Sequence, residues 1–447
     1  MGLLDKILSK VGASETKKKV FRNLYWAVLG KVVTLLGSLF VGILVARYLG
    51  PEQYGLMSYV ISYVSLFQIF ASFGMDGIEV REMSKKETDV NLILGTVFRL
   101  KLLLALVTII LVVVTALFFE SDNFTISLIT LYSLSIILNC FNVIRSYFTS
   151  IVWNEYIVKS EISRTLLGAS VKVILLLLKA PLWAFIVATV FDTALLSIGY
   201  ILAYKTKIGS LSLWSYNKNI AKYILRQSFP LMLSGAAVII YQRIDQIMIG
   251  NMIDKESVGQ FSVAARFVEI IIFIPTIISQ TITPILVKLW NDKNKKLYKE
   301  KVQIFMNITL WGTFIIALII SICAYWLVYY TFGVNYIPAV SVLQIMTFKV
   351  VGIAFASTSG QIMVIEEIQK YAVFRNIVGC IVCVCLNFLL IPAYGIVGAA
   401  YVAIIASLTS GFLSHIFIPA YRDIFFMQLK ALCLGWIDLF KVKYLVK

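Results

Sequence analysis

The chain has 447 residues, of which 60% are hydrophobic and only 14% are charged. Soluble domains carry about 25% charged residues, so this composition excludes an ordinary soluble domain and indicates an integral membrane protein. The net charge of +17 does not indicate nucleic-acid binding, because Lys and Arg concentrate in alternate loops rather than in one domain.

Apolar segments follow one another along almost the whole chain, each close to the length of about 20 residues that a membrane-spanning helix needs. Transmembrane strands would require alternating apolarity, so helices are expected throughout. The predicted spans are 24–47, 56–75, 93–118, 125–148, 160–179, 182–204, 228–250, 258–287, 303–330, 338–364, 371–391 and 395–418.

Basic residues divide the loops between the two sides of the membrane. If the chain starts in the cytoplasm, the outward loops hold only Arg47, Lys179 and Lys255, and the inward loops hold the basic clusters. A miscounted span would break this asymmetry. The pattern therefore predicts twelve spans with both termini cytoplasmic, and no cleavable signal peptide at the basic N-terminus.

The chain also repeats itself after 204 residues. A gap-free shift of 22–64 aligns Arg22 with Arg226, and further pairs are Leu29 with Leu233, Glu52 with Glu256, Gly55 with Gly259, and Ser58 with Ser262. Both copies start on the same side, which predicts a parallel repeat of two six-helix bundles around a central cavity. The expected domains are an amphipathic N-terminus 1–23, a bundle 24–204, a cytoplasmic linker 205–227, a bundle 228–418 and an amphipathic tail 419–447.

Cysteine and histidine give no sign of a metal or catalytic site. Cys380, Cys383 and Cys385 lie together in an apolar run without a second Cys pair, so core packing is the better interpretation. His415 is the only histidine. We therefore predict no catalytic residues, no metal and no cofactor.

Several motifs resemble those of a known transporter family. The first span opens with Arg-Asn-x-x-Trp, and the turn at 46–55 reads ARYLGPEQYG; GMDGIEVRE follows at 74–82, RIDQIMIG at 243–250 and ESVGQFSVAAR at 256–266. These motifs are similar to the polysaccharide transporter, or Wzx-type flippase, family of the multidrug/oligosaccharidyl-lipid/polysaccharide exporter superfamily.

The resemblance implies a flippase, not an enzyme, in a bacterial cytoplasmic (inner) membrane. Its substrate would be a polyprenyl-diphosphate-linked oligosaccharide, such as an O-antigen or capsule repeat unit, moved from the inner to the outer leaflet. H⁺ or Na⁺ would be the coupling ion, and glycan polymerase machinery a further partner.

An anionic substrate head requires a cationic cavity. Basic residues inside or at the ends of spans are therefore candidates for substrate binding: Lys31, Arg22, Arg226, Arg243, Arg266 and Lys349. Arg266 and Glu269 lie one helical turn apart and are also expected to pair with each other. Arg99, Lys101 and Arg145 lie near cytoplasmic span ends, where interface anchoring explains them.

Three acidic residues are candidates for ion coupling: Asp192, Asp245 and Glu269. Asp192 is expected near the middle of its span, where burial favours a proton-accepting carboxyl. A fixed ion pair with Lys172 is the alternative for this residue.

Other functions remain open at this stage. A cation-coupled multidrug exporter shares the architecture, although a basic cavity would repel cationic drugs. A peptidoglycan-precursor flippase needs the same cationic cavity. A membrane-embedded glycan polymerase is less compatible, because its catalytic outward loop would exceed the roughly ten-residue loops expected here, such as 329–338.

Overall fold

The structure is a computed structural model that describes residues 15–85 and 89–437, and this part of the chain is almost entirely helical. Two compact units emerge from its internal contacts. The first comprises 1–45 and 67–232, and the second comprises 46–66 and 233–447. Segment 46–66 thus groups with the later part of the chain, whereas the sequence repeat places it in the first bundle. The predicted division into two six-span bundles stays a prediction.

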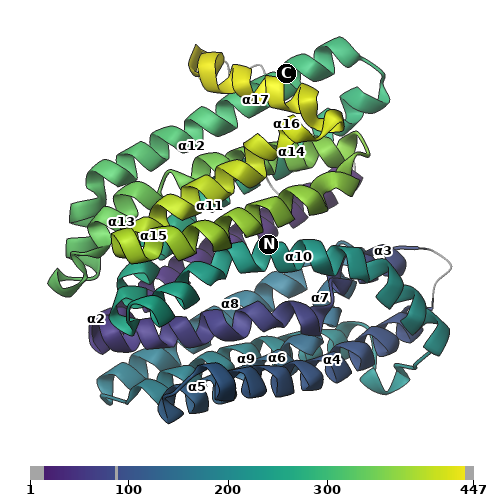
Figure 1. The fold of residues 1–447 in the computed structure, drawn as a ribbon. Helices are drawn as coiled ribbons and strands as arrows, with labels where there is room; N and C mark the ends of the chain where they lie inside the picture. The colour runs from purple at the N-terminus through teal and green to yellow at the C-terminus, as the bar shows by residue number, and fades with distance from the viewer. Residues whose placement is uncertain (1–14, 86–88, 438–447) are drawn as a thin grey trace. The chain divides into compact units, whose positions relative to one another are not determined.

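Figure 1 shows the helices that the structure describes up to residue 252. Their bounds, with those of the short elements, are α2 Glu15–Ser72, α3 Met75–Met83, α4 Val90–Phe119, α5 Asn123–Ser133, α6 Ser135–Leu138, η1 Asn139–Phe141, α7 Asn142–Ser150, α8 Asn154–Leu177, α9 Leu182–Lys207, η2 Leu211–Leu213 and α10 Lys218–Met252. Both α9 and α10 extend into the predicted linker 205–227, which leaves 208–217 between them.

The remaining elements all belong to the second unit. They are α11 Lys255–Asn291, α12 Lys295–Thr331, η3 Val334–Tyr336, α13 Ala339–Met346, α14 Lys349–Ile365, η4 Gln369–Tyr371, α15 Ala372–Leu408, the π-helical η5 Thr409–Leu413, α16 Ser414–Phe417, η6 Pro419–Tyr421 and α17 Arg422–Leu434.

Nine helical stretches in the described residues are long and apolar enough to cross a membrane. Two of them, Leu29–Ser72 and Ala372–Phe417, each contain a glycine with non-helical backbone, Gly50 (φ 73°) and Gly395 (φ 60°), and so divide into two helices. The shorter, more polar α8 coincides with the predicted span 160–179. Dividing these two stretches at their glycines adds two spans to the nine, and α8 adds one more. The described helices therefore agree with about twelve spans.

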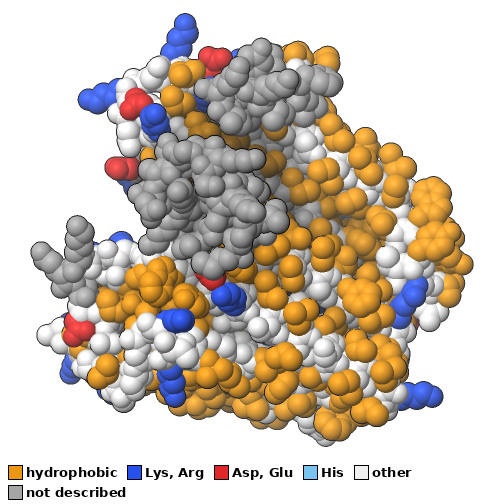
Figure 2. All heavy atoms as spheres, turned by 180° about the vertical axis from the view of Figure 1, so that it is seen from behind, with side chains coloured by type: hydrophobic (Ala, Val, Ile, Leu, Met, Phe, Trp, Pro, Cys, Tyr) orange, Lys and Arg blue, Asp and Glu red, His pale blue; other side chains and the backbone are white. Residues whose placement is uncertain are grey.

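Helix α4 shows how these helices meet a lipid environment. Large apolar side chains recur at helical spacing along one exposed face, including Leu103, Leu106, Val107, Ile110 and Leu117. Figure 2 shows that hydrophobic side chains dominate the face of the molecule seen there. A soluble protein does not tolerate such extensive apolar exposure, whereas a bilayer stabilises it.

Contacts between helices reveal a parallel helix pair in each unit. In the first unit, a Cβ at Gly30 would meet Val158 and a Cβ at Gly37 would meet Thr165, so α2 and α8 run in the same direction. In the second unit, Asn376 donates to Ser234 and Asn387 donates to Asp245, so α15 and α10 are also parallel. The predicted spans 24–47 and 160–179, the first and fifth, thus pair in the same way as 228–250 and 371–391, the seventh and eleventh. This agreement supports the parallel repeat.

A buried ion cluster joins α3, α4 and α7 of the first unit. Lys101 Nζ lies 2.9 Å from Glu79 Oε1 and 2.8 Å from Asp76 Oδ1, and Ser146 Oγ also donates to Glu79. Lys101 is only 3% exposed, so its prediction as an interface anchor is wrong. The reason is that α3, between two spans, supplies two carboxylates to the ammonium group. Burial raises the pKa of Glu79, against the opposing effect of Lys101.

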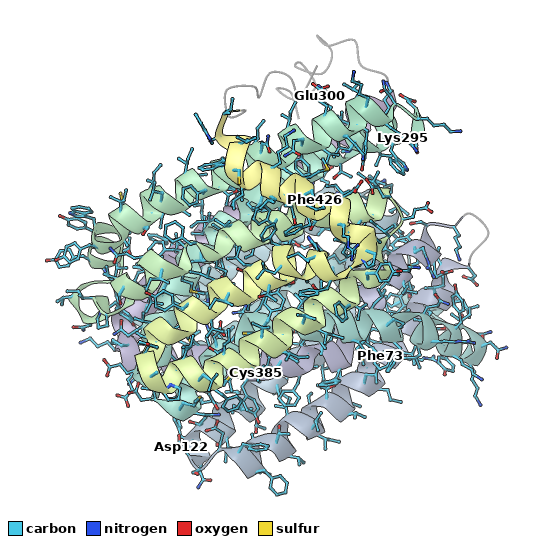
Figure 3. The ribbon with its side chains drawn as sticks, turned by 45° about the horizontal axis from the view of Figure 1, so that its top comes forward. Phe73, Asp122, Lys295, Glu300, Cys385 and Phe426 are labelled. Carbon is cyan, nitrogen blue, oxygen red and sulfur yellow. The ribbon has the colours of Figure 1, made fainter. Side chains whose placement is uncertain are left out.

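The end of the described chain forms helix α17, which packs on the start of α12. Trp311 Nε1 donates to Ala431 O at 2.9 Å, and Lys299 Nζ lies 3.2 Å from Asp423 Oδ2. Figure 3 shows Phe426 of α17 beside the helix that carries Lys295 and Glu300. One face of α17 is buried and Phe426 is exposed on another, as expected for an amphipathic helix. The rest of the predicted tail, 438–447, and residues 1–14 of the predicted N-terminal segment lie outside the described residues.

Candidate functional site

Segment 46–66 is held in the second unit by a close helix crossing at glycine. A Cβ at Gly55 would lie 1.7 Å from Lys255 O, and a Cβ at Gly259 would lie 2.1 Å from Pro51 O. Both positions therefore require glycine. The two contacts match under the 204-residue repeat, because Pro51 corresponds to Lys255 and Gly55 to Gly259.

Polar side chains gather one to three turns beyond this crossing. Ser58 and Ser62 from α2 line a cavity of about 30 Å³ together with residues of α10 and α11, namely Arg243, Gln246, Ser262, Ala265, Arg266 and Glu269, and with Ile61. Ser62 Oγ donates to Gln246 Oε1. We call this group of residues the polar pocket.

Two arginines of the polar pocket share one carboxylate. Arg243 Nη2 lies 3.6 Å from Glu269 Oε1, and Arg266 Nη1 lies 3.5 Å from Glu269 Oε2. The pairing of Arg266 with Glu269 is the one that their spacing predicts. The three side chains remain 35–40% exposed, so solvent can reach them. Among the described residues that line the pocket, two are arginines and one is a glutamate, so the lining carries an excess of positive charge.

The cavity itself is small. A volume of about 30 Å³ accommodates roughly one water molecule, and much less than a sugar or a diphosphate. In this structure the side chains of the polar pocket therefore pack against one another, and a larger ligand can enter only after α2 separates from α10 and α11.

Asp245 directly precedes Gln246 of the polar pocket in sequence, but its side chain faces α15. It is 1% exposed, and its Oδ1 accepts from Asn387 Nδ2 at 2.7 Å and from Cys383 Sγ at 3.4 Å. The buried Lys349 acts on this carboxylate at longer range. Asp245 Oδ2 is buried without a hydrogen-bond partner in the described residues. Asp245, Asn387 and Cys383 thus form a second, buried cluster.

Asp192 occupies a different environment in the first unit. Lys172 Nζ donates to Asp192 Oδ2, so the expected alternative of an ion pair is the arrangement present here. Gly168 allows this approach, because a Cβ there would lie 2.0 Å from Asp192 Oδ1. Within the first unit, Asp192 is therefore held by Lys172.

The remaining candidates belong to the first unit. Lys31 and Arg226 are exposed on α2 and α10. Arg22 lies within α2, and its side chain lies outside the described part of the structure. Sequence reasoning missed Ser62 and Gln246, although the repeat aligns Ser62 with Arg266 and provides the signal for the former.

Known proteins resemble this chain in fold. The structure titled "Lipid II flippase MurJ, inward closed conformation" matches with a TM-score of 0.70 at 17% identity, covering 92% of each chain. The MATE multidrug transporter DinF-BH matches with a TM-score of 0.66 at 18% identity, covering 92% of this chain and 96% of that one. An inward-facing MATE family transporter of the MOP superfamily gives 0.65 at 15% identity, with 87% and 96% covered.

Sequence comparisons identify the family. No curated protein matches this chain. A MatE family model matches residues 230–389, and the model described as "Polysaccharide biosynthesis protein" matches residues 20–290, which is more than half of the chain. The chain therefore belongs to the polysaccharide biosynthesis protein family of the multidrug/oligosaccharidyl-lipid/polysaccharide exporter superfamily.

Proposed function

We propose that this protein is a flippase for a polyprenyl-diphosphate-linked oligosaccharide, moving it from the inner to the outer leaflet of a bacterial cytoplasmic membrane. Membership of the polysaccharide biosynthesis family supports a glycan substrate. The fold, similar to that of a lipid II flippase, supports movement of a lipid-linked head group. Alternating access between two six-helix bundles, with both termini in the cytoplasm, is the mechanism we propose.

The observation that carries the proposal is the excess positive charge of the polar pocket. Arg243 and Arg266 share Glu269 at 3.6 and 3.5 Å, so an incoming diphosphate can replace or supplement the Glu269 carboxylate. The planar fork of a guanidinium group matches phosphate oxygens in a bidentate manner. Because the lipid tail stays in the bilayer, only the polar head requires such a site.

Ion coupling is best assigned to Asp245 among the three acidic candidates. Glu269 is engaged by two arginines, and Asp192 is paired with Lys172. Asp245 is buried, has one oxygen without a partner in the described residues, and adjoins the polar pocket through its neighbour Gln246. Binding of H⁺ or Na⁺ to this oxygen would satisfy it, and we propose that this event couples to transport.

The test is transbilayer movement of a labelled polyprenyl-diphosphate oligosaccharide in proteoliposomes. We expect Arg266→Gln to slow the movement at least tenfold, because a charge-assisted hydrogen bond contributes about 1.5–3 kcal/mol. Lys288→Gln is the matched control, since Lys288 is an exposed cation of the same helix α11. Unchanged movement in Arg266→Gln would contradict a role for the polar pocket.

The same assay separates the other functions. No movement of any diphosphate-linked sugar, together with proton-driven release of a cationic dye, would identify a multidrug exporter. Movement restricted to a peptide-bearing head group would identify a peptidoglycan-precursor flippase. We expect the labelled lipid to be recovered with unchanged mass, whereas a longer glycan would reveal a polymerase.

A further inference from the structure

Arg375 is a partly buried arginine in the first turn of α15. Its Nη1 donates to Ser359 Oγ of α14 at 3.1 Å and lies 3.8 Å from Met363 Sδ. A Cβ at Gly360 would lie 3.8 Å from Nη2, so the guanidinium group rests against the α14 backbone. Its Nε is buried and has no hydrogen-bond partner in the described residues.

Two other interior cations of the described chain have acidic partners, but Arg375 has none within ion-pair distance there. Lys101 pairs with Glu79, and Lys172 pairs with Asp192. The phenols of Tyr241 and Tyr421 act electrostatically on Arg375 but carry no charge at neutral pH. An arginine cannot lose its proton in a protein, so the charge remains uncompensated.

An uncompensated buried charge destabilises a fold, and the described contacts of Arg375 do not balance this cost. Removing an ion from water is costly, and hydrogen bonds to a neutral hydroxyl and a thioether recover only part of this cost. The dipole at the C-terminus of α14 adds only a small stabilisation. A charged residue inside a membrane bundle is by default a candidate for a substrate or ion pathway.

The surroundings of Arg375 suit a phosphorylated ligand. The neighbouring Asn376 donates to Ser234 of α10 at 3.0 Å and lies 3.4 Å from Ser410. With Ser359, these groups provide neutral hydroxyls and an amide but no carboxylate that would repel an anion. The exposed Lys370 precedes Arg375 at the expected cytoplasmic end of α15, the side from which the proposed substrate enters.

We propose that Arg375 binds the diphosphate of the incoming substrate, as a loading site separate from the polar pocket. This inference rests on the proposed function. Arg375 lies at the opposite end of the span from the turn at Gly395, whereas the polar pocket adjoins the outward turn between α10 and α11. The second unit then offers cationic ligands at both ends of its spans.

The experiment combines thermal unfolding with ligand binding, using purified full-length protein in detergent. Wild type, Arg375→Met and the control Lys370→Met are titrated with a short-chain prenyl diphosphate, and with the corresponding monophosphate and inorganic diphosphate. We expect Arg375→Met to bind the prenyl diphosphate at least tenfold more weakly and to unfold at or above the wild-type temperature, because it removes a buried charge. Lys370→Met should bind within twofold of wild type.

The possible outcomes are distinct. A lower unfolding temperature of Arg375→Met, with unchanged affinity, would overturn the proposal and assign the arginine to the packing of α14 and α15. Equal affinity of wild type and Arg375→Met at equal stability would overturn it as well. If Arg375→Met binds normally but Arg266→Gln still abolishes flipping, only the loading site fails. If the wild type neither binds nor flips any diphosphate, the proposed function fails too.

Discussion

Replacement of Gly55 by alanine tests the helix crossing that adjoins the polar pocket. The new Cβ would lie 1.7 Å from Lys255 O. Carbon and carbonyl oxygen approach to about 3.3 Å at the closest. The helices must therefore separate by roughly 1.6 Å, the difference between these two distances. Neither side can yield locally, because both contacting groups are backbone.

Such overpacking typically costs about 1–3 kcal/mol. We expect Gly55→Ala to lower the unfolding temperature of the detergent-purified protein. Gly259→Ala should do so to a smaller degree, because its Cβ would lie 2.1 Å from Pro51 O and requires a separation of roughly 1.2 Å. The double variant should cost less than the sum, since one separation accommodates both methyl groups.

The matched control is Gly312→Ala in α12, where an added Cβ meets nothing within 4 Å. Alanine is favoured over glycine in a helix by about 1 kcal/mol, so this variant should unfold at or above the wild-type temperature. Thermal unfolding followed by circular dichroism measures all four variants. If Gly55→Ala behaves like Gly312→Ala, the crossing in the structure is not the packing of the protein.

Three further predictions concern charged groups of the first unit. Glu79→Gln should lower the unfolding free energy by about 3–5 kcal/mol, because it removes a charged partner from the buried Lys101. Adding Lys101→Met to this variant should recover most of the loss, as measured by chemical unfolding. Equal stability of the single and double variants would contradict the pairing. Asp192→Asn should lower the unfolding temperature without altering the ion dependence of flipping, and Lys172→Met should restore the stability; a changed ion dependence would instead make Asp192 the coupling group. Burial alone would raise the pKa of Glu82, but hydrogen bonds from its two basic neighbours and a tyrosine outweigh it and hold the pKa below its usual value. This contribution to stability is present above pH about 4.3 and is lost as pH falls through the lowered pKa. Glu82→Gln should therefore make the unfolding temperature fall less steeply between roughly pH 5 and pH 3. An unchanged slope would exclude a contribution of Glu82 to the pH dependence of stability.

Hydropathy predicted the spans because the length of an apolar segment depends on bilayer thickness alone. The turns after spans 1 and 11 are shorter than expected. At Gly50 and Gly395 a single residue with positive φ changes the helix direction, and each pair of spans remains one almost continuous helix. Glycine adopts this backbone region without a steric penalty, so the two residues were the available signal.

Side-chain partners were harder to predict than spans. When a helix is apolar on all faces, its sequence does not predict which face packs against which neighbouring helix. The sequence therefore predicted an interface anchor at Lys101, whereas in the structure Lys101 pairs with Glu79 of α3. Asp245 and Arg243 lie two residues apart in sequence, yet the first faces α15 and the second faces α11. Arg266 and Glu269 were predictable because helical spacing alone brings them together.

The contact between Gly55 and Gly259 also bears on the ancestry of the chain. Residue 55 meets residue 255, and residue 259 meets residue 51, which is the reciprocal pattern of an isologous interface. Two identical six-span polypeptides would form this pattern about a two-fold axis. Fusion of such a homodimer into one chain would preserve the glycines on the axis and allow residues farther away to diverge, as where Ser62 and Ser65 correspond to the charged Arg266 and Glu269.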